Sequence, residues 1–501
     1  MNLLRYRIYC LILLLLLFIF IIFKCFLMDD IDLSKIYLEN EKKNNLVNAV
    51  LINKQQIVYN KEENICYVPS IDFLENNKIS ASSIFGKIKI YLDFENDEYK
   101  LIAFSDKYYQ VIDVIVTNMS IVSVYNNDIP KFSSDFFNYD LLSDFIKDEK
   151  TVSNVGVHFF GLNGLNIKSE ARMSVRGASS QLFDKKAYKL KFPNKVNLVN
   201  DYRDDVWALD AFYTDKSKIR NKLSSDIWNS INNNQNINND LYVDYCELFI
   251  DNEYVGLYSL KNKVNKDITG VTSDGILIKS IAILREYYVE NLLNNNFNLK
   301  DGFFLNYEIK KYSDSGYYSI LSKLKDYYSH YYDIVDYEFV DRNYDIDNFI
   351  NYKIFVALIS GDDNITYNQY ISLSNSNSKI LTTPWDMDLT WGLRWGDYDE
   401  LYSAFSMNSS IDGNWMYNGI RFNMDYKTFS MLKHRYWELR KDVITMNTIN
   451  SYLDSYEKLL IDSGAALRDS ERWYQYDVEF EIEQIREWAS RRIQFLDEYF
   501  K

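Results

Sequence analysis

The chain begins with an apolar run long enough to cross a lipid bilayer as a helix. Every residue from Ile8 to Phe23 is hydrophobic, and after one lysine the run resumes through Met28. A spanning helix needs about 20 such residues. Arg5 and Arg7 precede the run and aspartates follow it, so the positive-inside rule predicts a cytoplasmic N-terminus and an extracytoplasmic remainder.

A cleaved signal peptide is the alternative interpretation of this run. Signal peptidase sites carry small residues at alternating positions, and no such pattern follows the segment. We therefore predict that residues 1–28 form a cytoplasmic tip and an uncleaved single-pass anchor. The membrane is then one expected partner of the protein.

Composition limits the chemistry that the remaining residues can perform. The protein has 501 residues, 47% of them hydrophobic, which suits two or three domains with buried cores. With three histidines and four cysteines, neither a histidine-rich zinc site nor a disulfide framework is supported. The formal net charge of −15 disfavours nucleic acid as a partner, because phosphates attract lysine and arginine. Carboxylates, asparagine, lysine and arginine remain as candidate functional groups.

Residues 29–118 have the pattern of a small β-rich domain. Lys87–Asp93 alternates apolar and polar residues with the period of a strand, and Val111–Val116 is a β-branched run of strand length. The intervening pieces, rich in Asn, Asp and Ser, are typical of turns. We expect a β-sandwich-like fold here, and no residue in this domain suggests catalysis.

Residues 119–501 mix strand and helix patterns, which predicts the α+β class. Tyr242–Ile250 and Tyr254–Leu260 have the pattern of a hairpin, whereas the apolar residues of 346–358 recur at helical spacing. Helical spacing also dominates the end of the chain. We therefore expect residues 426–501 to be a helical C-terminal part of this domain.

Two polar segments of this domain are connected in a way that should bring them together. The predicted helix leads into a loop that contains Asp363 and Asn368, and a second acidic pair, Asp386 and Asp388, follows two short strand patterns. A hairpin returns the chain to its starting point, so Asp363, Asn368 and Asp386 are expected to lie close together. Carboxylate and amide oxygens of this kind suit Mg²⁺ or Mn²⁺.

Asp363 and Asn368 have the spacing of the catalytic aspartate and metal-binding asparagine of protein kinases, where a hairpin also leads to a metal-binding aspartate. In that chemistry one carboxylate takes the proton of the acceptor hydroxyl, while the other groups hold metal against the phosphates. Asp386 and Asp388 share a face if the chain is extended there. Each spacing alone is common, so acids in solvated turns are the alternative interpretation, and the connecting hairpin favours a site.

Cations are expected near the phosphates of such a site. Lys189 and Lys191 lie on one face of a predicted strand, and Arg176 lies on the preceding strand. The loop between the strands contains Gly177 but no glycine-rich phosphate-binding motif. A solvated strand face is the alternative interpretation of these lysines.

These residues, in this order, resemble the CotH family of spore-coat-type atypical protein kinases. The resemblance extends from about Met119 to the C-terminus, and several motifs in the correct order are far more specific than any one of them. The matching pieces are Ser174–Ser180, Lys185–Phe192, Asp215–Asn221, Glu247–Tyr258, Asp363–Asn368, Pro384–Gly392, Tyr436–Arg440 and the final helix.

The resemblance implies a protein-kinase-like fold and transfer of the ATP γ-phosphate, with Mg²⁺ or Mn²⁺, to Ser/Thr of a coat or envelope protein. By position it implies that Asp363 is the catalytic base. It implies that Asn368 and Asp386 hold the metal, with Asp388 as a further ligand or a group behind the ligands.

The resemblance also bears on nucleotide binding. Lys189 is the preferred phosphate-contacting lysine, Lys191 is a close second, and Arg176 would support the phosphates or the loop above them. Family members usually carry an acidic residue after the predicted hairpin, where this chain has Asn262. That departure leaves nucleotide contacts near this position open.

Two other functions remain open at this stage. An extracytoplasmic kinase-like domain would lie where ATP is scarce, so a non-catalytic protein for surface binding, adhesion or envelope assembly is the main alternative. Hydrolysis of sugars by paired carboxylates in an aromatic cleft is a third possibility. It leaves the ordered motifs unexplained.

Overall fold

The computed structural model describes residues 36–37, 40–126, 152–177, 181, 183–199, 201–233, 239–281, 307–329, 336–365, 367–393, 424–474 and 476–501. The predicted cytoplasmic tip and anchor, residues 1–28, lie outside these ranges, as do residues 178–180 of one family motif. Within the described ranges, no helix is both long and apolar enough to span a membrane.

The chain divides into two compact units, which are described separately. The first unit runs to Ile115 apart from Pro69–Ile71, and the second consists of those residues and Val116–Lys501. The boundary expected from the sequence, after residue 118, lies close to this division.

The first unit contains two β-sheets. One has the strand order β4-β5-β9-β8-β7, with β1 paired in parallel to β9, and the other has the order β3-β2-β6. The predicted strand at Lys87–Asp93 corresponds to β7, and Val111–Val116 is the end of β9. The elements are β1 (Glu41–Lys42), β2 (Ala49–Ile52), β3 (Gln55–Gln56), β4 (Val58–Asn60), β5 (Ile65–Val68), β6 (Ile79–Ser82), β7 (Lys89–Glu95), β8 (Glu98–Phe104) and β9 (Tyr108–Val116), with the short helix α3 (Ile71–Glu75) at the division between the units.

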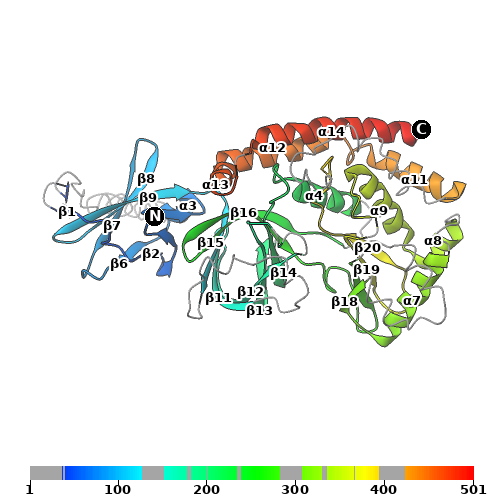
Figure 1. The fold of residues 1–501 in the computed structure, drawn as a ribbon, viewed down its shortest axis with the longest axis horizontal. Coiled ribbons are helices and arrows are strands. Elements are labelled where there is room, and N and C mark those ends of the chain that lie inside the picture. Colours follow the sequence, from blue (N-terminus) through cyan, green and yellow to red (C-terminus); the bar gives the residue numbers. More distant parts are fainter. Residues whose placement is uncertain are drawn as a thin grey trace, which may run out of the picture. The chain divides into compact units, whose positions relative to one another are not determined.

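The second unit begins with a closed barrel of order β10-β11-β12-β13-β14-β16-β15 (Figure 1). Strand β10 closes it by pairing in parallel with β15. Strand alternation sends Tyr188, Leu190 and Phe192 of β13 into the buried interior, so the lysines between them face outward. The strands are β10 (Ser120–Asn126), β11 (Val152–Phe160), β12 (Asn166–Arg176), β13 (Ala187–Val199), β14 (Tyr202–Asp210), β15 (Val243–Ile250) and β16 (Glu253–Asn262).

The predicted hairpin at Tyr242–Leu260 is confirmed as β15 and β16. Asp251 and Asn252 form its turn with left-handed φ values of 51° and 71°. This turn type requires positive φ at both positions, and Asp and Asn tolerate that region better than other non-glycine residues.

The rest of the second unit is a sheet covered by helices. The sheet has the order β18-β17-β19-β20, and α4, which follows β14 along the chain, packs against α9. Helix α9 is apolar on nearly all sides and is buried on nearly all sides, as expected for a helix inside a core. The elements are α4 (Arg220–Asn233), β17 (Ile276–Ser280), β18 (Tyr307–Lys311), α7 (Asp314–Ser329), α8 (Tyr337–Asn343), α9 (Ile346–Ile359), β19 (Gln369–Leu373) and β20 (Leu381–Pro384).

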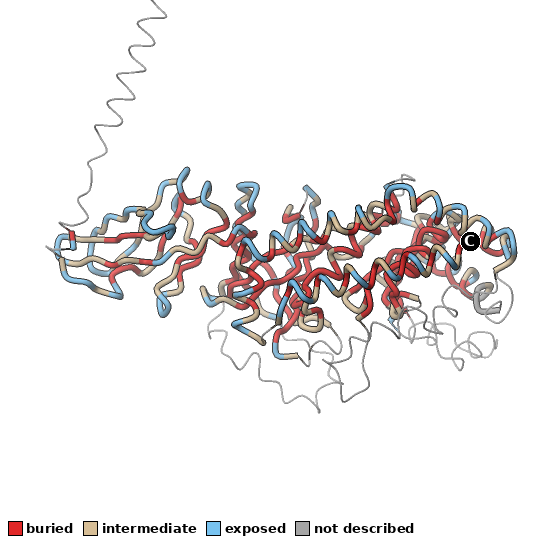
Figure 2. The backbone as a smooth tube through the Cα atoms, turned by 90° about the horizontal axis from the view of Figure 1, so that it is seen from above, coloured by how far each residue is buried: buried red, intermediate tan, exposed pale blue. Residues whose placement is uncertain are grey.

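Helices form the end of the chain, as the periodicity predicts. The capping side chains Asp425, Thr445 and Asp477 accept hydrogen bonds from backbone N–H groups in the first turns of α11, α12 and α14. Buried and exposed residues alternate along these helices (Figure 2), because each turns one face to the core. The helices are α11 (Tyr426–Leu439), α12 (Met446–Asp462), α13 (Ala465–Arg472) and α14 (Val478–Tyr499). Sheets and helices together confirm the α+β class.

Candidate functional site

The loop that contains Asp363 is held in shape by its own backbone and by a buried asparagine. The N–H groups of Tyr367 and Asn368 donate to the carbonyl of Asp363, at 3.0 and 2.8 Å. The side chain of Asn364 is buried and donates to the carbonyls of Asn368 and Trp385, both at 2.8 Å. Asn364 therefore ties the two polar segments together, a role that the sequence interpretation missed although the residue follows Asp363 directly.

We predict that Asn364→Asp lowers the free energy of unfolding by about 2–3 kcal/mol, because two buried carbonyls lose their donor. Chemical denaturation measures this change. Asn377→Asp is the matched control, since Asn377 is exposed in the turn between β19 and β20. Equal stability of the two variants would contradict the role assigned to Asn364.

The β19–β20 hairpin returns the chain to Asn368. The strands pair from Gln369 with Pro384 onward, and the N–H of Trp385 donates to the carbonyl of Asn368 at 3.0 Å. Asp386 follows with a left-handed φ of 57°, an uncommon conformation for a residue other than glycine. The structure thus places Asn368 and Asp386 in one small region.

Tyr367 shows that Asp363 belongs to the same region. Burial raises the pKa of the Tyr367 hydroxyl, and the charges of Asp363 and Asp386 raise it further. A hydroxyl that is affected by both carboxylates lies close to both. Backbone hydrogen bonds also join Asn368 to Asp363 and Trp385 to Asn368, so Asp363, Asn368 and Asp386 lie in one region, and their chemical roles remain predictions.

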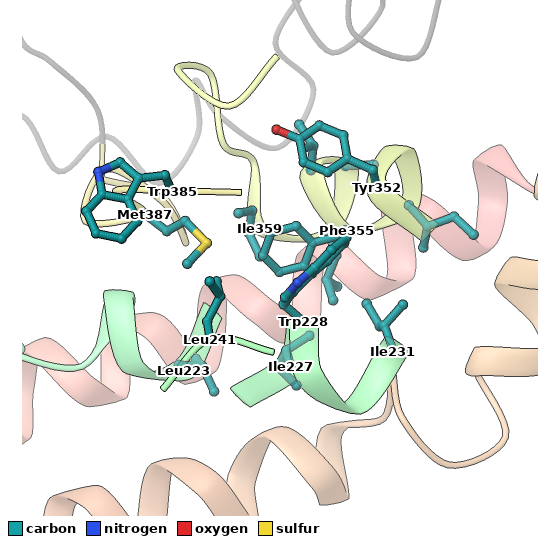
Figure 3. Packing of buried hydrophobic residues seen from close by; sticks show 14 of the residues in the cluster. Leu223, Ile227, Trp228, Ile231, Leu241, Tyr352, Phe355, Ile359, Trp385 and Met387 are labelled. Carbon is teal, nitrogen blue, oxygen red and sulfur yellow. The ribbon is translucent and has the colours of Figure 1, made fainter. Parts of the chain in front are cut away.

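Met387 anchors the two aspartates that flank it. Its side chain is buried in the core and points toward Leu241 and Leu223 (Figure 3). The side chain of Asp386 is 39% exposed, and Asp388 accepts a hydrogen bond from the hydroxyl of Thr214 at 3.2 Å. Burial of the residue between them fixes both carboxylates at the edge of the core.

A buried lysine connects Asp386 to the barrel. The side chain of Lys261 on β16 is 3% exposed, and its Nζ lies 3.4 Å from Oδ1 of Asp386. Lys261 also pairs with Asp210, which in turn pairs with Arg176. The Lys261 Nζ and the guanidinium carbon of Arg176 lie 4.3 and 5.5 Å from the centroid of the Trp385 ring, as in cation–π contacts.

The two aspartates differ in their affinity for protons. Burial raises the pKa of Asp388 to about 7, and the nearby charge of Asp386 adds to this effect. Burial opposes ionisation of Asp386 as well, but the charges of Lys261, Arg176 and Lys279 outweigh it and hold the pKa below its ordinary value. Asp386 is therefore ionised near neutral pH, which a metal ligand requires.

Burial lowers the pKa of Lys261 to about 8, while the carboxylate of Asp386 opposes this change. Asn262, the next residue, stands where CotH relatives usually carry an acidic residue. Its side-chain oxygen accepts a hydrogen bond from the N–H of Tyr242 at 2.9 Å. Asn262 thus holds the start of β15, and the neighbouring Lys261 faces the site.

A pocket opens beside these groups. Arg176, Asp386 and Asp388 line it together with Lys185 and Asp210. Of the residues predicted to bind nucleotide or metal, Arg176, Asp386 and Asp388 line the pocket.

The predicted lysines Lys189 and Lys191 do not line this pocket. Lys189 is half-buried on the outer face of β13, two residues beyond the pocket-lining Ala187, and Lys191 is exposed. Two other lysines are closer to the pocket. Lys185 lines the pocket and pairs with Asp469, and Lys261 pairs with the pocket-lining Asp386. Lys185 is the first residue of a motif found in the sequence, whereas the signal for Lys261 is weaker: a lysine on the same strand face as the buried Leu257.

The Asp215–Asn221 motif positions the second acidic segment. Arg220 is fully buried, pairs with Asp215 at 2.6 Å and donates from Nε to the carbonyl of Thr390 at 3.0 Å. Trp391 donates from its ring N–H to Ser224 at 2.9 Å and from its backbone N–H to the carbonyl of Ile359 at 2.7 Å. The segment after Asp388 is thereby fixed to both α4 and α9.

A buried ionic network joins the pocket to the C-terminal helices. Nζ of Lys185 lies 2.5 Å from Oδ1 of Asp469 on α13, and Nζ of Lys218 lies 3.4 Å from Oδ2 of the same carboxylate. Asp469 also accepts a hydrogen bond from the N–H of Leu257 at 2.9 Å. Lys185 is thus oriented by a residue far away in the sequence.

The site's donor set fits a hard divalent cation. No cluster of three or more His, Cys, Asp or Glu side chains able to hold a metal occurs in the described part of the chain. Asp386 and Asn368 supply oxygen atoms only, with Asp388 close by, and Mg²⁺ commonly combines few protein ligands with water and phosphate oxygens. Such a set leaves positions open for a nucleotide.

Comparison with known families identifies the larger unit. A family model described as CotH kinase protein matches residues 173–496. The chain belongs to the CotH family. The matched range includes every predicted site residue and confirms the family resemblance seen in the sequence. No curated protein matches this CotH chain.

Proposed function

We propose that this CotH protein is an ATP- and metal-dependent kinase that phosphorylates Ser or Thr of another protein. One observation carries the proposal. Asp363, Asn368 and Asp386 meet at the end of a hairpin, and Asp386 faces a pocket that also contains Arg176 and Lys185. Phosphoryl transfer needs this set of groups: a base, metal ligands, and cations that contact the phosphates.

Each group has a distinct task in this mechanism. Asp363 orients the acceptor hydroxyl and takes its proton as the oxygen attacks the γ-phosphorus, while the bond from that phosphorus to the β–γ bridging oxygen breaks and ADP leaves. Asn368 and Asp386 would hold Mg²⁺ or Mn²⁺, which would supply positive charge to the phosphate oxygens. Arg176 and Lys261 offset the charges of Asp210 and Asp386, and both cations lie over the ring of Trp385.

We predict that ATP with Mn²⁺ raises the melting temperature of the purified full-length chain. A ligand at 100 times its dissociation constant stabilises the folded state by about 2.7 kcal/mol. Asp386→Ala should abolish the shift, because it removes a metal ligand. Asp442→Asn is the control, since Asp442 is exposed and follows α11, away from the pocket residues.

Two results would decide between this proposal and a non-catalytic binding protein on the same fold. Transfer of labelled γ-phosphate to the chain or to a Ser-rich acceptor supports the kinase. A chain that neither shifts with ATP and Mn²⁺ nor transfers phosphate supports surface binding or adhesion instead.

The acceptor and location are also proposed. The apolar run in residues 8–28 supports a membrane anchor with an extracytoplasmic CotH domain, and a Ser/Thr-rich coat or envelope protein would be its acceptor. Digestion of intact cells by added protease tests the orientation. A CotH domain that is protected until the membrane is opened would overturn it.

A further inference from the structure

Three lysines lie outside the pocket but are charged neighbours of one another, and one of them, Lys279, lies near Asp386. Lys263 lies just beyond β16, Lys279 on β17 and Lys310 on β18. In the sheet register Lys279 lies directly opposite Glu308, and Lys310, two residues later at a register shift, pairs with Glu308. These residues are called the lysine cluster below.

The cluster carries more positive than negative charge. Glu308 pairs with Lys310. In the described part of the chain, no ion pair or hydrogen bond reaches the ammonium groups of Lys263 and Lys279. Both side chains are half-buried, so water compensates them only in part.

The pKa directions of the lysines agree with the strand register and with the Lys310–Glu308 pair. Burial lowers the pKa of Lys263 to about 8, and the charge of Lys310 lowers it further. Burial also lowers the pKa of Lys279, with Arg176 and Lys310 acting in the same direction. Like charges held together in this way destabilise the free protein and favour binding of an anion.

The lysine cluster lies outside the pocket. Arg176, Asp386 and Asp388 line the pocket, whereas Lys263, Lys279 and Lys310 do not. Lys279 still lies near enough to Asp386 for that carboxylate to affect its pKa. Strand β18 is at the edge of its sheet. A ligand on the cluster would therefore lie beside the pocket and not inside it.

We propose that Lys263, Lys279 and Lys310 bind a phosphorylated side chain of the acceptor protein. A phosphate monoester carries nearly two negative charges and three acceptor oxygens, which matches three ammonium donors better than a single carboxylate does. The proposal rests on the proposed kinase function. It implies that the enzyme prefers Ser-rich segments that already carry phosphate, since product of one transfer then helps to bind the next acceptor residue.

The test compares two Ser-rich peptides that differ in one phosphoserine, bound to the full-length chain. Titration calorimetry with ADP and Mn²⁺ in excess keeps nucleotide present and prevents transfer. The wild type should bind the phosphopeptide about tenfold more tightly, and the preference should weaken as salt is added. The double variant Lys263→Gln/Lys279→Gln should lose the preference.

Lys311→Gln is the matched control, because Lys311 lies on the same strand β18 but its ammonium group donates to the carbonyl of Tyr312. The melting temperature of the double variant should be unchanged or higher, since repulsion is removed, which separates lost binding from misfolding. If the double variant Lys263→Gln/Lys279→Gln keeps the preference for the phosphopeptide, the proposal is wrong. It is also wrong if that variant loses affinity for ATP and keeps the peptide preference. A preference that persists in a chain shown to lack phosphoryl transfer would reject the kinase function but keep the site.

Discussion

Asp363→Asn is expected to lower the rate of phosphoryl transfer by about a hundredfold to ten-thousandfold, the usual range for loss of a general base. The amide keeps the size of the side chain but accepts no proton at neutral pH. The carbonyl of Asp363, which binds the N–H groups of Tyr367 and Asn368, is unaffected by the substitution. The loop should therefore keep its shape, and the dissociation constant for ATP should change little.

Asp362→Asn is a demanding control for this experiment. Asp362 is the neighbouring residue of the same type, but its charge acts on the buried Arg492 of α14, whose guanidinium donates to the carbonyl of Ala357 at 2.8 Å. Its loss should reduce stability and change the transfer rate by less than about tenfold. Initial rates at saturating ATP measure both variants. If Asp363→Asn and the wild type label an acceptor equally, the assignment of the catalytic base is wrong.

The grouping of Asp363, Asn368 and Asp386 could be predicted because it depends on local structure. A helix end, a short loop and a hairpin are each encoded by nearby residues, and a hairpin must return to its start. Strand alternation likewise predicts which side of β13 faces the barrel core. The fold class follows from the same local patterns.

The lysines of the site could not be assigned in this way. The CotH resemblance favours Lys189 and then Lys191, and strand alternation directs both outward, but neither says what the outer face of the strand contacts. Lys185 meets Asp469, which is 284 residues away along the chain, and Lys261 meets Asp386, 125 residues away. Such contacts depend on how the barrel and helices pack, and no local pattern in a single sequence encodes them.

Asp469→Ala is expected to lower the free energy of unfolding by about 3–5 kcal/mol, the usual effect of breaking a buried ion pair on one side. The side chains of Lys185 and Lys218 have no solvent exposure and would lose their counterion, and the N–H of Leu257 would lose its acceptor. Equilibrium denaturation with urea measures the effect. Asp267→Ala is the matched control, because Asp267 pairs with Lys195 at the surface and such pairs contribute at most about 1 kcal/mol.

The stability that Asp469 contributes depends on pH in a definite direction. Burial opposes ionisation of Asp469, but the charges of Lys185 and Lys218 hold its pKa below the ordinary value of 3.8. Its stabilising contribution is therefore complete above about pH 4 and is lost as the pH falls through the lower pKa of the folded state. In Asp469→Asn the pKa of Lys185, about 8 when the carboxylate is present, should fall further, so the stability gap between the wild type and the variant should widen from pH 7 to 5 and narrow only in stronger acid.

A double variant separates the stabilising role of this pair from its role in the pocket. Lys185→Met/Asp469→Leu replaces the closest charged pair with apolar groups, which often restores most of the stability lost on breaking a buried pair. Lys218 keeps the carbonyl of Phe212 as a hydrogen-bond partner at 3.0 Å, so its burial is partly compensated. The double variant should therefore fold. Because Lys185 lines the pocket, this variant should nevertheless bind ATP with Mn²⁺ more weakly than the wild type. Full ATP affinity in a stable double variant would show that α13 braces the barrel without contributing to the pocket.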